Sequence, residues 1–330
     1  MEETVMGTVA PDHILKELVD LWVTTGKEAE GGQGVLRACS LTLVAMAEES
    51  DDPMALGETL AALMPEHPAR TISIRLSGAA ARTLTERVYA QCWMPFGQRR
   101  QICCEQVEIT ASDAALEDLP SVVLPLEVPD LPVVLWCRSV RLAAMPEFDA
   151  LAQLAQKVVV DTAPIADSRA ALELVASLAA RGIWAADLSW TRTTRWRETL
   201  AGIFENHSYL DGLARTTKVR VASKREQPTV RSWYLAAWVM DALAKVGARP
   251  RLEMTRSEHT GVTLEGEDWS VALERWGARL VTTINGLAQC TSLPAPSDYD
   301  LMREELGILR RDPIFENTLS SALKLVHAED

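Results

Sequence analysis

The 330-residue sequence lacks the close ligand pairs that metal centres and dithiol redox motifs use. Its six cysteines form no C-x-x-C pair, and none of its five histidines lies at ligand spacing from another histidine or a cysteine. It also contains no G-x-S-x-G elbow, no H-E-x-x-H motif and no phosphate loop ending in G-K-[ST]. From these absences we expect no metal, no cofactor and no catalytic centre.

Long apolar runs are missing as well. The longest is WYLAAWVM, residues 233–240, and a membrane-spanning helix needs about 20 such residues. The first residues, MEETVMG, have neither the basic nor the apolar region of a signal peptide. We therefore expect a cytoplasmic protein whose thiols stay reduced.

Basic residues are too few for a nucleic-acid partner, because the formal net charge is −13 and phosphate backbones are bound by clustered Lys and Arg. The charge is unevenly placed. Residues 1–60 hold 3 basic and 12 acidic side chains, whereas residues 187–225 hold 8 basic and 4 acidic ones. The basic stretch is either a solvated face or a charged docking patch for another protein.

The order of apolar patterns predicts the fold. Up to about residue 205, strand-like runs alternate with helical spacing; the runs lie at 35–46, 71–76, 87–93, 101–110, 121–126, 132–137 and 157–161, and the helices at 12–23, 53–64 and 168–181. This order indicates an α/β domain with a mixed or mostly parallel sheet flanked by helices. Short strands, a helix at 232–248 and closing helices at 297–323 then predict a smaller α+β domain. We place the domains at 1–210 and 211–330.

Two cysteines, Cys103 and Cys104, are adjacent in a strand-like run. A bond between them would be strained, since neighbouring Cα atoms lie about 3.8 Å apart and disulfides need about 4.4 Å or more. In a strand their side chains point to opposite faces. We interpret them as small apolar strand residues, with a redox-sensing thiol as the alternative.

Two further groups of residues are candidates for binding. The segment at 187–205, DLSWTRTTRWRETLAGIFE, is rich in Trp and Arg, the residue types that concentrate binding energy at protein interfaces. Its partner-binding candidates are Trp190, Arg192, Arg195, Trp196 and Arg197. In the competing interpretation, Trp196 belongs to the core and the arginines pair with the acidic first domain.

Asp130 and Asp161 each adjoin a buried apolar run, and open α/β sheets bind ligands beside the ends of their strands. They either face a pocket or are loop aspartates that accept bonds from nearby backbone amides.

Several segments, in order along the chain, resemble the glucose-6-phosphate dehydrogenase assembly protein OpcA family. They are HPAR (67–70), ICCEQVEI (102–109), LPLEVPDLPVVLW (124–136), VVVDTA (158–163), the segment at 187–205, and LRRDPIFENTL (309–319). The chain departs from the family at Trp136 and Cys137, where two tryptophans are common, and residues 217–290 are similar only loosely.

The resemblance implies a non-catalytic partner of glucose-6-phosphate dehydrogenase that promotes its active oligomeric state in the oxidative pentose phosphate pathway. The residues alone leave an alternative open. It is a protein or enzyme that binds a sugar phosphate or nucleotide near Asp130 and Asp161.

Overall fold

The computed structural model describes residues 10–28, 35–94 and 101–328, so the glycine-rich stretch at 30–34 lies outside the described residues. The chain forms two compact units. The first comprises Met1–Asp161, Arg181–Ala185 and Asp298–Leu309, and the second Thr162–Ala180, Ala186–Ser297 and Arg310–Asp330. We call them the sheet A unit and the sheet B unit. The predicted first domain, 1–210, includes residues 162–180 and 186–210, which this division places in the second unit.

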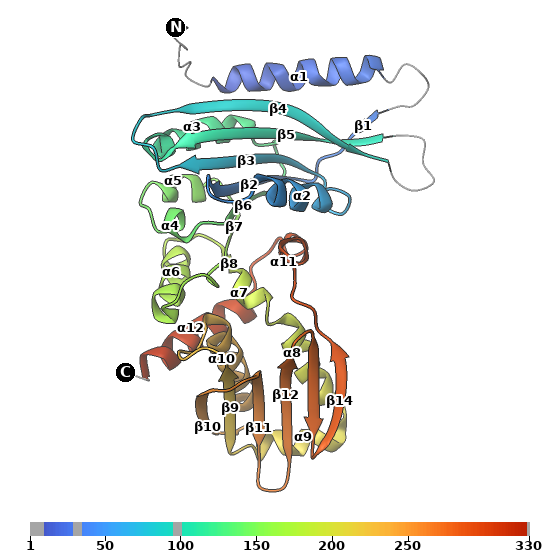
Figure 1. The fold of residues 1–330 in the computed structure, drawn as a ribbon, viewed down its shortest axis with the longest axis vertical. Coiled ribbons are helices and arrows are strands. Elements are labelled where there is room, and N and C mark those ends of the chain that lie inside the picture. Colours follow the sequence, from blue (N-terminus) through green and yellow to red (C-terminus); the bar gives the residue numbers. More distant parts are fainter. Residues whose placement is uncertain (1–9, 29–34, 95–100, 329–330) are drawn as a thin grey trace. The chain divides into compact units, whose positions relative to one another are not determined.

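Along the chain, the strands of sheet A alternate with helices, as predicted (Figure 1). Its strands are β1 Val35–Arg37, β2 Leu41–Glu48, β3 Ala69–Ser77, β4 Leu84–Trp93, β5 Gln101–Ser112, β6 Val133–Cys137, β7 Lys157–Val160 and β8 Ala185–Asp187. They run in the order β1-β5-β3-β2-β6-β7-β8, with β4 paired to β5. The β4–β5 pair is antiparallel, and the pairs that join β1 to β7 along this order are parallel. The mostly parallel α/β sheet is confirmed.

Strand burial explains why these runs are continuously apolar. All five residues of β6 and all four of β7 are buried, as expected for strands covered on both faces. The helices of this unit are α1 Pro11–Glu28, α2 Pro53–Leu63, α3 Leu119–Val123, α4 Val140–Ala143, α5 Phe148–Ala152 and α11 Asp298–Leu306. Helix α1 lies along β4, and α11 packs on α2.

One predicted strand is wrong. Residues 121–126 lie in α3 and in a following 3₁₀ turn, Leu124–Leu126. Pro120 occupies the first turn of α3, where its missing N–H removes no helical hydrogen bond. A short apolar run does not distinguish a buried strand from a buried helical turn. The run at 35–46 is also not one strand but two, β1 and β2, which pair with different neighbours.

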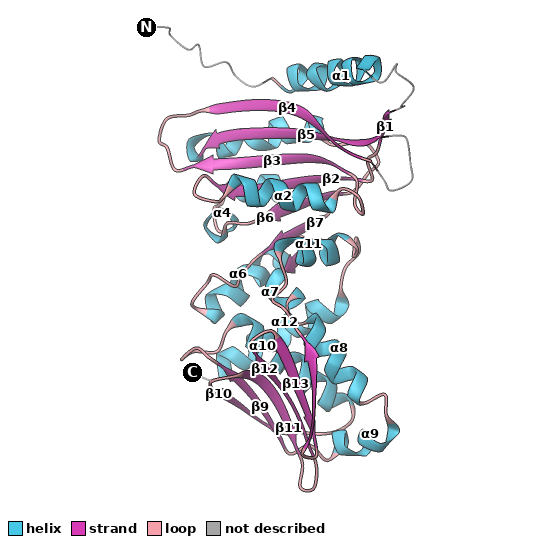
Figure 2. Ribbon diagram, turned by 45° about the vertical axis from the view of Figure 1, so that its right-hand side comes forward, coloured by secondary structure: helices cyan, strands magenta, loops and turns pink. Residues whose placement is uncertain are grey.

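Sheet B is smaller and mixed. Its strands are β9 Lys218–Ser223, β10 Arg251–Arg256, β11 Thr260–Glu265, β12 Ser270–Trp276, β13 Arg279–Ile284 and β14 Leu287–Ser292, in the order β10-β9-β11-β12-β13-β14. The β9–β10 pair is parallel and the other pairs are antiparallel. The unit also holds α6 Ser168–Ala180, α7 Leu188–Thr191, α8 Thr194–Ile203, α9 His207–Ala214, α10 Val230–Lys245 and α12 Pro313–Ala328 (Figure 2). This arrangement confirms the second, smaller α+β part.

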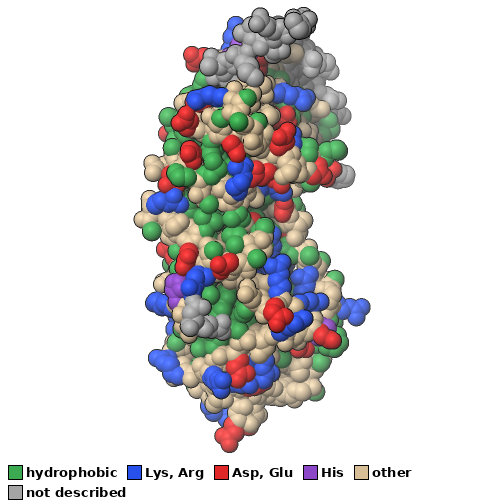
Figure 3. All heavy atoms as spheres, turned by 60° about the vertical axis from the view of Figure 1, so that its left-hand side comes forward, with side chains coloured by type: hydrophobic (Ala, Val, Ile, Leu, Met, Phe, Trp, Pro, Cys, Tyr) green, Lys and Arg blue, Asp and Glu red, His purple; other side chains and the backbone are tan. Residues whose placement is uncertain are grey.

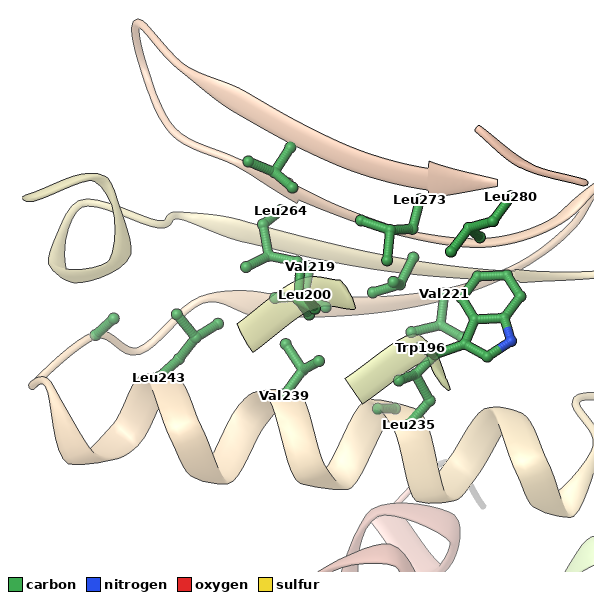
Figure 4. Close-up of a cluster of buried hydrophobic side chains, with 14 of the residues drawn as sticks. Trp196, Leu200, Val219, Val221, Leu235, Val239, Leu243, Leu264, Leu273 and Leu280 are labelled. Atoms are coloured by element: carbon green, nitrogen blue, oxygen red, sulfur yellow. The ribbon is translucent and has the colours of Figure 1, made fainter. Parts of the chain in front are cut away.

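The core of the sheet B unit lies between one face of the sheet and helices α8 and α10 (Figure 4). Val219 and Val221 alternate along β9 and point inward, as the two-residue period of a strand requires. Leu235, Val239 and Leu243 recur every four residues on α10 and form the facing helical stripe. Among the helices of the described segments, none has the length and hydrophobicity of a membrane-spanning helix.

Candidate functional site

The Trp- and Arg-rich segment begins at a buried aspartate. Asp187 caps α7, because its carboxylate accepts the backbone N–H of Ser189 at 2.8 Å. The same carboxylate accepts the hydroxyl of Thr162 at 2.6 Å and that of Tyr234 at 3.0 Å. Burial, and then the charge of Asp187, raise the pKa of Tyr234 well above its usual value, so its hydroxyl stays protonated and donates. This network fixes where the α7–α8 segment starts.

Trp190 is buried inside the sheet B unit. Its ring centroid lies 6.0 Å from that of Tyr234 and 5.9 Å from that of Phe315. The guanidinium of Arg197 lies over the ring, 3.7 Å from its centroid, and also donates to the Thr193 hydroxyl at 3.0 Å. A cation and an aromatic face in this arrangement attract each other. Trp190 and Arg197 therefore stabilise the unit itself.

Trp196 belongs to the core. It is 3% exposed and packs from α8 against sheet B and α10, as Figure 4 shows. This position agrees with the part of the competing interpretation that concerns Trp196. Arg195 is different, because its side chain is 77% exposed and forms an ion pair with Glu198 of the same helix at 3.2 Å. Of the five predicted contact residues, Arg195 is the one at the open surface of α8.

The fifth candidate, Arg192, lines a cavity of about 200 Å³ within the sheet B unit. Arg225 and Arg231 line it too, and we call it the arginine cavity. Ser189 and Thr229 add hydroxyl groups to the wall, and Ile165 adds an apolar side chain. A neighbouring cavity of about 280 Å³ shares Arg225 and Thr229. On the face drawn in Figure 3, several Lys and Arg side chains lie close together in the lower part, which holds sheet B elements.

The sequence analysis missed Arg225 and Arg231. Arg225 lies at the end of the basic stretch 187–225, so the charge count contained it without singling it out. Arg231 lies two residues after Thr229, whose side chain caps α10 by accepting the N–H of Ser232. The two arginines come from the loop after β9 and the first turn of α10, and Arg192 follows α7. A single sequence gives no signal that three such segments meet.

Asp130 and Asp161 are not brought together. Asp130 lies before β6, Asp161 follows β7, and these neighbouring strands are parallel. Parallel strands start at one edge of the sheet and end at the other, so the two carboxylates lie at opposite edges. Asp130 occupies the left-handed region with φ of 64°, which suits an aspartate in a turn. One pocket formed by both residues is excluded by this topology.

The cysteines also differ from the expectation of reduced thiols. Cys103 is joined by a disulfide to Cys92, which lies directly opposite it on β4. Cys104 is a free, buried thiol that donates to the backbone oxygen of Ala38. Burial raises the pKa of Cys104 to about 11, which opposes the thiolate that a reactive sensor needs. Within the described segments, no group of three or more His, Cys, Asp or Glu side chains is placed to hold a metal ion.

Two family models match the chain in succession. Residues 61–177 match the model described as the glucose-6-phosphate dehydrogenase subunit N-terminal domain, and residues 183–319 match the corresponding C-terminal domain. The two matches together define a protein of the class that these models describe as a glucose-6-phosphate dehydrogenase subunit. The chain belongs to the glucose-6-phosphate dehydrogenase assembly protein OpcA family.

Curated relatives agree with this assignment. A protein of Synechococcus elongatus, named as an OxPP cycle protein OpcA, is 25% identical over 181 residues, which are 54% of this chain and 40% of the relative. A protein of the same name from Synechocystis is 27% identical over 153 residues, 46% of this chain and 31% of the relative. The matched region thus spans well under half the length of these relatives.

Two oxidoreductases are among the solved structures that match the chain. KijD10, a 3-ketoreductase from Actinomadura kijaniata, has a TM-score of 0.45 at 15% identity, over 87% of this chain and 96% of that one. An aldose-aldose oxidoreductase from Caulobacter crescentus has a TM-score of 0.45 at 12% identity, with the same two coverages. Similarity at this level carries no information about activity.

Proposed function

We propose that the protein is a non-catalytic, cytoplasmic assembly factor that binds glucose-6-phosphate dehydrogenase and favours its active oligomeric state. The observation that carries the proposal is the presence of both family domains, in order, over residues 61–319. The first match contains strands β3 to β7 of sheet A, whereas β1 and β2 lie before residue 61, and the second match contains all six strands of sheet B. A partner with two folded parts offers a rigid surface for recognition.

Such a factor acts by binding one state of the enzyme better than another. A tenfold change in the substrate affinity of the enzyme requires about 1.4 kcal/mol of differential binding. One well-packed interface hot spot is worth about 2 kcal/mol or more. A modest interface is therefore enough, and no catalytic group is required of this chain.

The exposed side of α8 is our candidate for part of the interface. Trp196 and Leu200 anchor the helix on the core, so its opposite side is presented in a fixed orientation. Arg195 lies on that side. Exchanging its ion pair with Glu198 for a carboxylate of a partner costs little free energy, because the present pair is solvent-exposed. In this proposal, Arg195 contacts the dehydrogenase. The segment that presents Arg195 is held in place by Trp190, Trp196 and Arg197.

The proposal is tested by mixing the purified chain with the dehydrogenase of the same organism. Size exclusion with light scattering gives the complex and its stoichiometry. An assay at sub-saturating glucose 6-phosphate gives the effect on the enzyme. Co-migration together with a changed apparent substrate affinity supports the proposal. Separate peaks and unchanged kinetics, in both reducing and oxidising buffer, refute it.

The interface is tested with a matched pair of variants. Arg195→Ala removes an exposed arginine from α8, and Arg215→Ala removes one of similar exposure that pairs with Asp268 at 3.1 Å. We expect Arg195→Ala to weaken the complex about tenfold and Arg215→Ala to leave it unchanged. Equal affinities of both variants and the unaltered chain would remove α8 from the interface.

A further inference from the structure

Two deeply buried cations among the described residues each have a carboxylate partner. Lys157 is 2% exposed and pairs with Glu305 at 2.6 Å, and Arg70 pairs with Glu105 at 2.6 Å. This is the general rule, because an ion taken out of water needs a counter-charge. Arg231, half-buried in the first turn of α10, makes no hydrogen bond or ion pair with any residue that the structure describes.

Two arginines near Arg231 carry a charge of the same sign as its own. Burial, and then the positive charges of Arg275 and Arg192, together lower the pKa of Arg231 to about 10. The guanidinium is still charged at neutral pH, so the free protein carries an electrostatic cost here. Destabilising arrangements of this kind are found at functional sites, where a bound ligand offsets their free-energy cost.

The wall of the cavity offers donors. Arg192, Arg225 and Arg231 together present guanidinium N–H groups, which match the paired oxygens of a phosphate or carboxylate. Thr229 and Val230 place the N-terminus of α10, a helix of 16 residues, at the same cavity. The partial positive charge of a helix N-terminus also favours an anion. Ser189 adds a hydroxyl to the wall.

The volume sets the size of the occupant. The arginine cavity of about 200 Å³ is small for a drug-sized ligand but holds a phosphate group with several further atoms. The adjoining cavity of about 280 Å³ extends the space beyond Arg225 and Thr229. Ile165 provides an apolar wall against which the body of a small molecule packs. An isolated inorganic ion would leave most of this space unfilled.

We infer that the arginine cavity binds a small organic phosphate, with the phosphate group held by Arg192, Arg225 and Arg231. The inference does not rest on the proposed function, because the cavity lies wholly within the sheet B unit. It differs from the site predicted near Asp130 and Asp161, which belong to the sheet A unit.

The test compares the thermal stability and ligand affinity of the full chain with those of two variants. Arg231→Met keeps an unbranched stem of similar bulk, shorter than arginine, and removes the charge. Arg249→Met is the control, four residues beyond the C-terminus of α10, where Arg249 is exposed and donates to backbone oxygens of Ala244 and Ala248. The probes are a hexose 6-phosphate, inorganic phosphate, the unphosphorylated hexose and a short acidic peptide. Binding is measured by calorimetry, and stability by the melting temperature Tm.

We expect the hexose phosphate to raise Tm and to bind more tightly than inorganic phosphate, with no effect of the hexose alone. Arg231→Met should weaken binding at least about tenfold, since a charge-assisted hydrogen bond is lost. The same variant without ligand should melt at or above the temperature of the unaltered chain, because an unpaired charge has been removed. Arg249→Met should bind like the unaltered chain.

Three results would overturn the inference. Equal binding of inorganic phosphate and the hexose phosphate would make the occupant a free anion. Binding of the acidic peptide in place of the phosphates would assign the arginines to a protein contact. A marked loss of Tm in ligand-free Arg231→Met would show that Arg231 has a structural role. None of these results bears on whether the chain binds the dehydrogenase.

Discussion

Replacing Trp196 by alanine tests whether this residue is a core residue or a surface hot spot. Its side chain is 3% exposed and packs among Val221, Leu235 and Leu200. An indole buries about 200 Å² on folding, which at about 25 cal/mol per Å² corresponds to about 5 kcal/mol. This is an upper estimate, because the unfolded chain already buries part of that surface. We therefore expect Trp196→Ala to lower the free energy of unfolding of the sheet B unit by about 3–5 kcal/mol.

The assay is urea unfolding followed by far-UV circular dichroism, with Trp276→Ala as the control. Trp276 is 51% exposed at the end of β12 and stacks on His259 with ring centroids 4.5 Å apart. Its removal should cost less than about 1 kcal/mol, as for surface residues in general. A loss below about 1 kcal/mol for Trp196→Ala, coupled with lost binding of the dehydrogenase, would refute its place in the core and restore it as a contact residue.

Three further predictions concern the sheet A unit. Glu305→Gln should lower the free energy of unfolding by about 3–5 kcal/mol in chemical denaturation, because Lys157 is left charged and unpaired at 2% exposure; a change below about 1 kcal/mol would contradict the buried ion pair. Replacing both Cys92 and Cys103 by serine should cost about 3 kcal/mol under oxidising conditions, since the bond spans 11 positions of the sequence; identical unfolding curves with and without reductant for the unaltered chain would show that the bond is absent. The hydrogen bond from Arg141 holds the pKa of Glu48 below its usual value, so the stability that Glu48 contributes is present above its unfolded pKa of about 4.3 and is lost as the pH falls through the lower folded pKa. Glu48→Gln should therefore flatten the acid limb of the stability–pH curve, and an unchanged limb would contradict this pair.

Much of the fold was predictable because its signals are local. The buried runs of β6 and β7 and the four-residue spacing on α10 each follow from burial of one element. The helical turns at 121–126 were not predictable as helix, since apolar content alone gives no period over six residues. Strands β12 and β14 were missed; β14 is exposed at every position and therefore has no apolar pattern.

The candidate site was less predictable because it depends on which segments meet. The abundance of Trp and Arg at 187–205 marked the right segment, but composition does not tell a buried indole from an exposed one. Packing decided that Trp190 and Trp196 lie inside and that Arg195 lies outside. The Cys92–Cys103 pair depends on the register of β4 on β5, and Cys103 was considered only with its sequence neighbour.

The central claim is that this chain shifts glucose-6-phosphate dehydrogenase toward its active oligomer. The most direct measurement is analytical ultracentrifugation of the dehydrogenase at a concentration where its oligomers are in equilibrium, with and without a saturating amount of this chain. The account predicts a larger fraction of the higher oligomer and a complex that sediments as one species. Unchanged oligomer fractions, with the two proteins sedimenting separately, would contradict it.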